Sequence, residues 1–266
     1  MEKWQNKIAV ITGASSGIGA AVAKDLAKIG LTVIGLARRS EKVEKLSSKL
    51  GNDCSGKIIA FKCDVSSLDS IKAAFKWIQE NFSCIHILVN NAGNGLMGSI
   101  LDASDQMTSA IQKTIDVNFS GLVHCTREAV PLMNDFGLII NVGSIFGHEV
   151  PCPNQSNLYP ATKFAVKAMS EIFRQELIVI GNEKIRVTNL SPGCVQTEIF
   201  KQAGIVDTET FFKLFPFLKP EDVSAAILYI LSTPYDVNIT ELTIRPVGEY
   251  LGNKNIEKIS NLRDFN

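Results

Sequence analysis

The chain has 266 residues, of which 45% are hydrophobic, a size that suits one large α/β domain or two small ones. Its 27 Lys and Arg residues balance 27 Asp and Glu residues, so no net charge would gather nucleic acid or an anionic membrane surface. Six cysteines occur without a C-x-x-C pair and without clustering with the three histidines, so neither a metal site nor a disulfide framework is indicated.

The first residues lack the apolar segment of a signal peptide and lead directly into a strand. No apolar run is long enough to cross a bilayer, so we expect a cytoplasmic protein without a membrane span. Apolar, β-branched runs then alternate with segments of helical periodicity. We predict strands at 7–12, 32–37, 57–62, 85–90, 138–142, 184–190 and 241–247, and helices at 18–29, 41–50, 68–81, 103–133, 159–181 and from 220 onward.

Strands that are nearly all apolar, each followed by a helix, are typical of a parallel sheet covered on both faces. We therefore predict a Rossmann-type, doubly wound α/β fold of about seven strands. No linker or repeat divides the chain, so we treat 1–266 as one domain. The segment 196–219 breaks the rhythm with five phenylalanines and is a candidate substrate lid, and the polar tail after Gly252 is expected to be mobile.

A glycine-rich turn, TGASSGIG, follows the first strand at 12–19. Gly13 permits a tight turn, Gly17 lets backbone approach a phosphate, and Gly19 lets the helix pack on the strand. With Ser15, Ser16 and Ile18, the turn would present the N-terminus of a helix to an anion. Glycine here could serve geometry alone, but its place at the first strand-to-helix turn favours a dinucleotide site.

The second strand ends in Ala37-Arg38-Arg39, where nicotinamide enzymes that use NAD carry an acidic residue for the ribose. Two guanidiniums suit the 2′-phosphate of NADP instead, so we predict NADP(H) as cofactor, with Arg38 the better candidate. Alternatively, one or both are ordinary solvated charges. Further cofactor contacts are expected at the ends of later strands, from Asp64 and Val65 and from Asn90, Asn91, Ala92 and Gly93.

Tyr159 and Lys163 are four residues apart at the start of a predicted helix, so their side chains should share one face. A cation near a phenol favours the phenolate and can draw its pKa toward neutrality, where an acid or base works best. The same spacing also arises by chance on many helices, so the pair needs support from the rest of the chain.

That support comes from an ordered set of motifs: TGASSGIG at 12–19, NNAG at 90–93, Asn118 in DVN, Ser144 in NVGS, Tyr159-x-x-x-Lys163 and PG at 192–193. Together they resemble the short-chain dehydrogenase/reductase family from about residue 7 to residue 197. Within that family, 14–23, 37–39 and 159–177 resemble the farnesol dehydrogenase type. Two departures are Gly143, where many members have a second serine, and a longer interval between Ser144 and Tyr159.

The resemblance implies an Asn-Ser-Tyr-Lys tetrad. Tyr159 would exchange the proton of the alcohol, Lys163 would lower the Tyr159 pKa and bind the nicotinamide ribose, and Ser144 would donate to the substrate oxygen. Asn118 would hold a water linked to Lys163. Pro192, Gly193, Val195 and Thr197 would add cofactor contacts. Considered alone, Asn118 could be a structural residue that bends a helix, and Ser144 could be a cap at the end of a strand.

An apolar cleft is expected from the Phe-rich segment with Leu96, Met97, Phe146 and Val150, and His148 and Cys194 are expected in its wall. Such a cleft suits a small apolar alcohol or carbonyl, with farnesol or another isoprenoid first. Hydroxysteroids, general carbonyl substrates and a non-catalytic NADP(H)-binding role are the alternatives. The phenylalanines could also simply pack on the sheet or on another subunit. The resemblance implies pairing through the helices at 103–133 and 159–181, which gives a homodimer or homotetramer.

Overall fold

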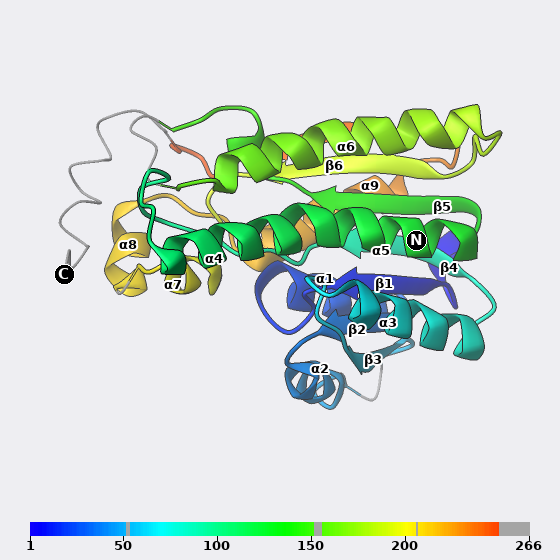
Figure 1. The fold of residues 1–266 in the computed structure, drawn as a ribbon. Helices are drawn as coiled ribbons and strands as arrows, with labels where there is room; N and C mark the ends of the chain where they lie inside the picture. The colour runs from blue at the N-terminus through cyan, green and yellow to red at the C-terminus, as the bar shows by residue number, and fades with distance from the viewer. Residues whose placement is uncertain (52–53, 152–155, 206, 250–266) are drawn as a thin grey trace.

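The structure is a computed structural model that describes residues 1–51, 54–151, 156–205 and 207–249 (Figure 1). Seven strands form one sheet in the order β3-β2-β1-β4-β5-β6-β7, and every neighbouring pair is parallel. The strands are β1 (Ile8–Thr12), β2 (Thr32–Ala37), β3 (Lys57–Lys62), β4 (Ile85–Asn90), β5 (Met133–Val142), β6 (Arg186–Pro192) and β7 (Glu241–Ile244). The predicted doubly wound, single-domain fold is confirmed.

Helices cover both faces of this sheet. One face carries α1 (Gly17–Lys28), α2 (Ser40–Ser47) and α9 (Pro220–Ser232), and the other carries α3 (Leu68–Asn81), α5 (Gly121–Ala129) and α6 (Tyr159–Val179) (Figure 1). Each face has its own apolar core, and the strand residues alternate between the two cores. Because both faces are covered, most strand residues are apolar, which is the pattern that the sequence displays.

The order of the strands reverses beside β1. The chain moves outward from β1 through β2 to β3, then returns to place β4 on the other side of β1 and continues to β7. Loops at the carboxyl ends of β1 and β4 therefore leave in opposite directions and open a crevice between them.

The long helix predicted at 103–133 is in fact four pieces. It consists of α4 (Asp105–Ile115), a π-helical turn η2 (Asp116–Ser120), α5 and a 3-10 turn η3 (Val130–Leu132). Pro131 in η3 has no N–H to donate to another helical turn, and β5 begins at Met133, earlier than predicted. Leu138 to Val142 pair with β6 as expected.

Two strands end elsewhere than predicted. β6 ends at Pro192 rather than Leu190, because Ser191 and Pro192 still pair with β7, and β7 ends at Ile244 rather than Val247. The predicted mobile tail after Gly252 lies outside the described residues, as do Cys152 and Pro153.

The segment 196–219 contains two short helices, α7 (Ile199–Gln202) and α8 (Thr208–Leu214). Its phenylalanine rings pack on one another, with Phe211 at 4.9 Å from both Phe200 and Phe215 between ring centroids. In Figure 1 these helices stand beyond the ends of the strands, beside the N-terminal end of α4. Over the described ranges, no helix combines the length and the apolarity needed to cross a membrane.

Candidate active site

An elongated cavity of about 410 Å³ lies at the carboxyl ends of the strands. The turn after β1 and the end of β2 line one part of it, the loop after β4 its middle, and segments after β5 and β6 its far part. Motifs that are far apart in sequence thus meet in one place, as the topology requires.

The glycine-rich turn has the backbone that the sequence predicts. Gly13 has a φ of 70° and Gly17 a φ of 54°, both in the left-handed region that favours glycine. A Cβ on Gly19 would approach Gly13 O to 2.5 Å, so Gly19 allows helix α1 to pack against the turn. Gly17 and Ile18, the first residues of α1, line the cavity, and the side chain of Ser16 makes no capping bond there. The N–H groups at this helix end are therefore available to an anion.

Thr12 joins this turn to the loop after β4. Its hydroxyl oxygen accepts hydrogen bonds from the N–H groups of Asn91 and Ala92, each at 3.0 Å. The amide of Asn91 donates in return to the carbonyls of Thr12, at 3.0 Å, and Gly13, at 3.3 Å. Because both loops are bound to each other, the floor of the crevice is fixed before any ligand arrives.

The two arginines differ in their surroundings. Arg39 donates to Glu198 Oε2 at 2.7 Å and to Ser16 Oγ at 3.3 Å, and Lys42 adds a second ion pair to Glu198 at 3.3 Å. Arg38 is exposed at the cavity edge, with no carboxylate within ion-pair distance in the described ranges. Its guanidinium is therefore the more available of the two for a ligand.

Asp64 lies near Arg38 at the same end of the cavity. Burial alone would raise the pKa of Asp64. The N–H and hydroxyl of Ser66, together with the charges of Arg38 and Lys113, nevertheless hold that pKa below its usual value. A charged carboxylate is thus retained beside Arg38.

Ser144, Tyr159 and Lys163 come together in the far part of the cavity. Ser144 follows β5, and its hydroxyl is hydrogen-bonded to the Tyr159 phenol. Lys163 Nζ lies 5.6 Å from the Tyr159 ring centroid and donates to the carbonyl of Val142 at 2.8 Å. One turn of α6 and one strand end therefore carry all three groups.

Asn118 lies in the π-helical turn η2, behind these residues. Its Oδ1 accepts from Asn94 N at 2.8 Å, and its Nδ2 donates to Asn94 O at 3.0 Å and to Thr162 Oγ1 at 3.3 Å. A Cβ on Gly93 would lie 3.5 Å from Asn118 Oδ1 and 4.0 Å from Lys163 Nζ, so all three are close. Asn118 is buried and does not itself line the cavity.

Burial controls the protonation of the central pair. It raises the pKa of Tyr159 to about 12, against the lowering effect of the Ser144 hydrogen bond, and it lowers the pKa of Lys163 to about 8. The expected lowering of the Tyr159 pKa by Lys163 is not found in the protein alone. The physical reason is that a site shielded from water penalises the phenolate and the ammonium alike.

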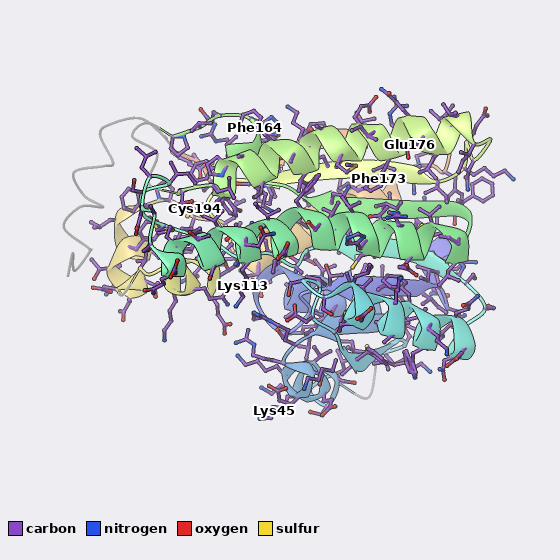
Figure 2. All side chains as sticks on the ribbon, in the orientation of Figure 1. Lys45, Lys113, Phe164, Phe173, Glu176 and Cys194 are labelled. Carbon is purple, nitrogen blue, oxygen red and sulfur yellow. The ribbon has the colours of Figure 1, made fainter. Side chains whose placement is uncertain are left out.

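The far part of the cavity is apolar. It is lined by Leu96, Met97, Phe146, Phe200, Ile205, Phe211 and Phe215. Cys194, which lies toward α7 in Figure 2, is part of this wall, and burial, followed by the charge of Glu249, raises its pKa to about 12. It therefore stays a neutral thiol, a wall group rather than a nucleophile.

Some sequence-predicted contacts lie elsewhere. Gly19 and Asn90 do not line the cavity, and the Asn90 amide instead donates to Thr126 and Asn141, each at 2.9 Å, beneath the floor. Val150 is exposed and outside the wall, and His148 belongs to a separate polar cluster. The remaining predicted contacts all line the cavity: Gly13, Ser15, Ser16, Gly17, Ile18, Arg38, Arg39, Asp64, Val65, Asn91, Ala92, Gly93, Tyr159, Lys163, Pro192, Gly193, Val195 and Thr197.

Several lining residues were not predicted, and three of them are polar groups of interest: Asn94, Glu198 and Glu249. Asn94 directly follows the NNAG motif and could have been added by extending it. Glu198 and Glu249 had no such signal, since each is defined by a partner distant in sequence. Glu249 accepts from Cys194 N at 2.6 Å and pairs with Arg245 at 2.8 Å.

Comparison with known proteins supports this arrangement. The sequence profile described as short chain dehydrogenase matches residues 7–205. The chain is a short-chain dehydrogenase/reductase.

Relatives of this dehydrogenase/reductase extend over nearly its whole length. It is 43% identical over 252 residues to the farnesol dehydrogenase of Aedes aegypti, covering 94% of this chain and 99% of the relative. It is 39% identical over 257 residues to dehydrogenase/reductase SDR family member 11 of Bos taurus, again with 94% and 99% covered.

Solved structures share the fold. An alcohol dehydrogenase from the archaeon Thermococcus sibiricus, in complex with 5-hydroxy-NADP, has a TM-score of 0.79 at 28% identity, over 92% of this chain and 99% of that chain. A serine dehydrogenase in complex with NADP⁺ has a TM-score of 0.80 at 32% identity, over 92% of this chain and 98% of that chain.

A nicotinamide dinucleotide, the cofactor of this family, fits the residues present. The turn at 13–17 leaves a glycine cradle at a helix N-terminus for the phosphates, since a Cβ on Gly17 would come within 3.0 Å of Thr197. The elongated cavity continues from there in two directions, to Arg38 on one side and to Tyr159 and Lys163 on the other. Arg38, Ser16 and Lys163 would thus bind different parts of the same molecule.

The lowered pKa of Lys163 predicts a pH-dependent stability. Lys163 has a pKa near ~10.4 when unfolded and about 8 when folded, so its contribution to stability is fully present above ~10.4 and is lost as the pH falls through 8. We expect the free energy of unfolding of wild type, relative to that of Lys163→Met, to rise between pH 8 and pH 10 by an amount on the order of 3 kcal/mol at most. The difference between the two proteins is the quantity compared, because burial raises the pKa of thiols such as Cys194, which lowers the free energy of unfolding over the same pH range in both proteins.

Urea unfolding of both proteins at several pH values measures this difference in the free energy of unfolding. Tyr159→Phe is the matched control and should keep nearly the wild-type pH dependence, because the Tyr159 pKa is about 12 in the folded protein and ~10 when unfolded, at or above the upper end of this range. An equal rise in wild type and Lys163→Met would contradict the burial argument.

Proposed function

We propose that this short-chain dehydrogenase/reductase interconverts an apolar alcohol and its aldehyde or ketone, with NADP(H) as the hydride carrier. The observation that carries the proposal is the position of the Tyr159 phenol. It is hydrogen-bonded to Ser144, lies near Lys163, and lines the same cavity as the glycine-rich turn and the apolar side chains. The bound nicotinamide would supply the acceptor or donor of the hydride.

Each of the four polar residues has a role that its environment supports. Ser144 would donate a hydrogen bond to the substrate oxygen while Tyr159 takes the hydroxyl proton, or returns it in the reverse direction. Lys163 would contact the nicotinamide ribose, and its positive charge would act against the burial that raises the Tyr159 pKa. Asn118, held by the backbone of Asn94, would fix a water that connects Lys163 to solvent.

Preference for NADP over NAD rests on the end of β2. Arg38 and Arg39 lie there and no acidic residue follows the strand directly. Arg38 is free of ion pairs in the described ranges, whereas Arg39 must leave Glu198 to bind a phosphate. The two similar structures with NADP or a modified NADP bound are consistent with this assignment.

The substrate class follows from the far part of the cavity. Rings and aliphatic side chains line it, and the charged groups beside it are already paired with protein atoms, as for Glu249. A long apolar alcohol would bury its chain there, and farnesol or a related isoprenoid is our first choice because of the 43% identical farnesol dehydrogenase. The segment 196–219 would act as the lid over this part. Hydroxysteroids and general carbonyl compounds share the same chemistry.

The helices that flank the site also offer a surface for a second subunit. Phe164 and Ile172 of α6 are 40% and 44% exposed, and Phe164 lies on the outer side of that helix (Figure 2). We propose that α6 and the α4–α5 rod pair between subunits, giving a homodimer or homotetramer. Light scattering should give a mass of two or four chains, which Phe164→Glu with Ile172→Glu should reduce. A monomeric wild type would contradict the proposal.

The first functional test is turnover with a panel of farnesol, other isoprenoid alcohols, hydroxysteroids and carbonyl compounds, followed by absorbance of the reduced nicotinamide. We expect farnesol or an isoprenoid alcohol to be oxidised with NADP. Tyr159→Phe should lower kcat by about 10² to 10⁴, since it removes the proton-transfer group, and leave the Kd for NADPH unchanged. Activity confined to steroids or carbonyls would redirect the substrate assignment. NADPH binding without turnover on any of them would favour the non-catalytic alternative.

The second test concerns the cofactor. Arg38→Asp should lower kcat/KM with NADP by about 10- to 100-fold, the range for one charge-assisted hydrogen bond, and improve use of NAD. Arg39→Asp should have a smaller effect because Arg39 is paired with Glu198. Lys45→Asp, an exposed charge change on α2 away from the cavity, is the matched control (Figure 2). Unchanged cofactor preference in Arg38→Asp would contradict the assignment.

A further inference from the structure

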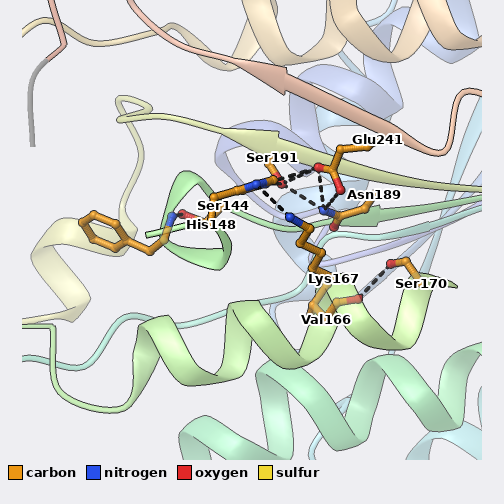
Figure 3. A network of polar contacts seen from close by, with 9 residues as sticks. Ser144, His148, Val166, Lys167, Ser170, Asn189, Ser191 and Glu241 are labelled. Carbon is orange, nitrogen blue, oxygen red and sulfur yellow. Dashed lines mark hydrogen bonds and ion pairs between the residues drawn. The ribbon is translucent and has the colours of Figure 1, made fainter. Parts of the chain in front are cut away.

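A polar cluster lies behind Ser144, outside the cavity (Figure 3). It joins His148, Lys167 on α6, Asn189 and Ser191 on β6, and Glu241 on β7. His148 Nδ1 is 3.0 Å from Lys167 Nζ, and its Nε2 is 2.9 Å from Ser191 Oγ and 3.2 Å from Glu241 Oε1. Four separate segments are therefore connected through one imidazole.

The partners fix the protonation pattern of His148. An ammonium can only donate, so Nδ1 must accept from Lys167, and the ring proton lies on Nε2, directed at Ser191 and Glu241. A second proton on the ring would put two donors face to face at Nδ1. This tautomer therefore satisfies all three contacts of the ring.

Gly143 makes room for the cluster. A Cβ at this position would lie 2.6 Å from Asn189 Oδ1 and 3.0 Å from Ser191 Oγ. The amides and hydroxyls of β6 thus occupy the space that a side chain before Ser144 would need. Asn189 Nδ2 donates to Ser191 Oγ at 2.9 Å and to Glu241 Oε1 at 2.9 Å, which extends the cluster to the edge strand.

His148 also ends the short turn that carries Ser144. The turn η4 (Ile145–Gly147) is bounded by Ser144 on one side and His148 on the other, and His148 N donates to Ile145 O at 2.9 Å. Within the turn, Phe146 N donates to Ser144 Oγ at 3.1 Å, and Phe146 packs near the Tyr159 ring at 6.3 Å. A displacement of His148 would therefore be transmitted to the Ser144 hydroxyl.

The turn has little space in which to shift. A Cβ on Gly147 would approach Lys163 O to 2.7 Å, so η4 packs directly on the first turns of α6, the helix that also carries Lys167. Lys167 lies one helical turn beyond Lys163, on the same side of α6. Two contacts therefore fix η4 on α6. One is the close backbone packing of Gly147 on Lys163, and the other is the hydrogen bond between His148 and Lys167.

We propose that His148 is a positioning residue, which ties the turn after Ser144 to α6, β6 and β7 and so keeps the Ser144 hydroxyl in hydrogen-bonding contact with Tyr159. The inference rests on the proposed function for its kinetic consequence only. The groups that face His148 are the charged Lys167 and Glu241 and the neutral Ser191, and Glu149, its chain neighbour, pairs with Arg245 at 3.2 Å. None of these residues contacts the reacting atoms.

The test compares His148→Leu with His148→Gln. Leu fills similar space without polar atoms, whereas the Gln amide has an oxygen to accept from Lys167 and an N–H to donate to Ser191. We expect kcat of His148→Leu to fall by about 10- to 100-fold, as for a catalytic group displaced by about 1 Å, with KM and the Kd for NADPH changed less than about twofold. His148→Gln should recover to within about threefold of wild type.

The pH profile gives a readout that a general loss of stability would not produce. The Ser144 hydrogen bond lowers the pKa of Tyr159, so its loss in His148→Leu should move the midpoint of alcohol oxidation to higher pH, while His148→Gln should not. His124→Leu, a histidine on α5 outside the cluster, is the matched control and should resemble wild type.

Hydrogen exchange keeps the inference testable if the wild type turns over none of the panel. The amides of 145–149 should exchange about tenfold faster in His148→Leu and at the wild-type rate in His148→Gln. Wild-type exchange in His148→Leu would overturn the inference whatever the activity. So would an active His148→Leu with wild-type kcat and pH midpoint, whereas an inactive wild type with altered exchange in His148→Leu would refute only the proposed function.

Discussion

The parallel pairing of β1 with both β2 and β4 is the constraint on which the site depends. Parallel strands bring all their carboxyl ends to one edge of the sheet, and the reversal of strand order beside β1 separates the loops that follow. The crevice so formed would be unstable if its loops were loose. The Thr12 hydroxyl prevents this by binding two consecutive N–H groups of the opposite loop, so one buried threonine joins the phosphate turn to the floor of the cavity.

The packing that positions the site residues also disfavours their charged forms. Tyr159 and Lys163 are placed accurately because strands and helices enclose them, and the same enclosure raises the pKa of the phenol and lowers that of the ammonium. At the opposite end the charges are exposed, and Arg39 is paired with Glu198 while Arg38 is not. The cavity therefore has an exposed, ionic end and an apolar end, where burial is the largest influence on the pKa values of Tyr159 and Lys163.

The sequence predicted the features that depend on near neighbours. The alternation of strands and helices, the glycines at 13 and 17, and the Tyr159 to Lys163 spacing are all local patterns, and the structure has them where expected. Features that depend on distant neighbours were not predicted. Glu198 lines the site as the ion-pair partner of Arg39, which lies 159 residues earlier in the chain. The location of His148 depends on its contacts with β6 and β7.

Two wrong expectations have the same origin. The helix predicted through 103–133 has helical periodicity, but residue pattern alone does not reveal a widened turn or the start of β5 at Met133. The Tyr159 pKa was expected to fall because of the neighbouring Lys163 charge, but burial raises it. The extent of burial cannot be predicted from a short segment of sequence. In both cases the tertiary environment outweighed the local signal.

The π-helical turn at 116–120 has a consequence for how this protein can vary. A turn closed by a bond from Gly121 N to Asp116 O holds one residue more than an α-helical turn, and Asn118 lies within it. Removing one residue from 116–120 would convert the widened turn to a regular α-helical turn and would change the relative directions of α4 and α5 little. It would, however, displace Asn118 from its hydrogen bonds with the Asn94 backbone, so the length of this turn is set by the asparagine that it positions.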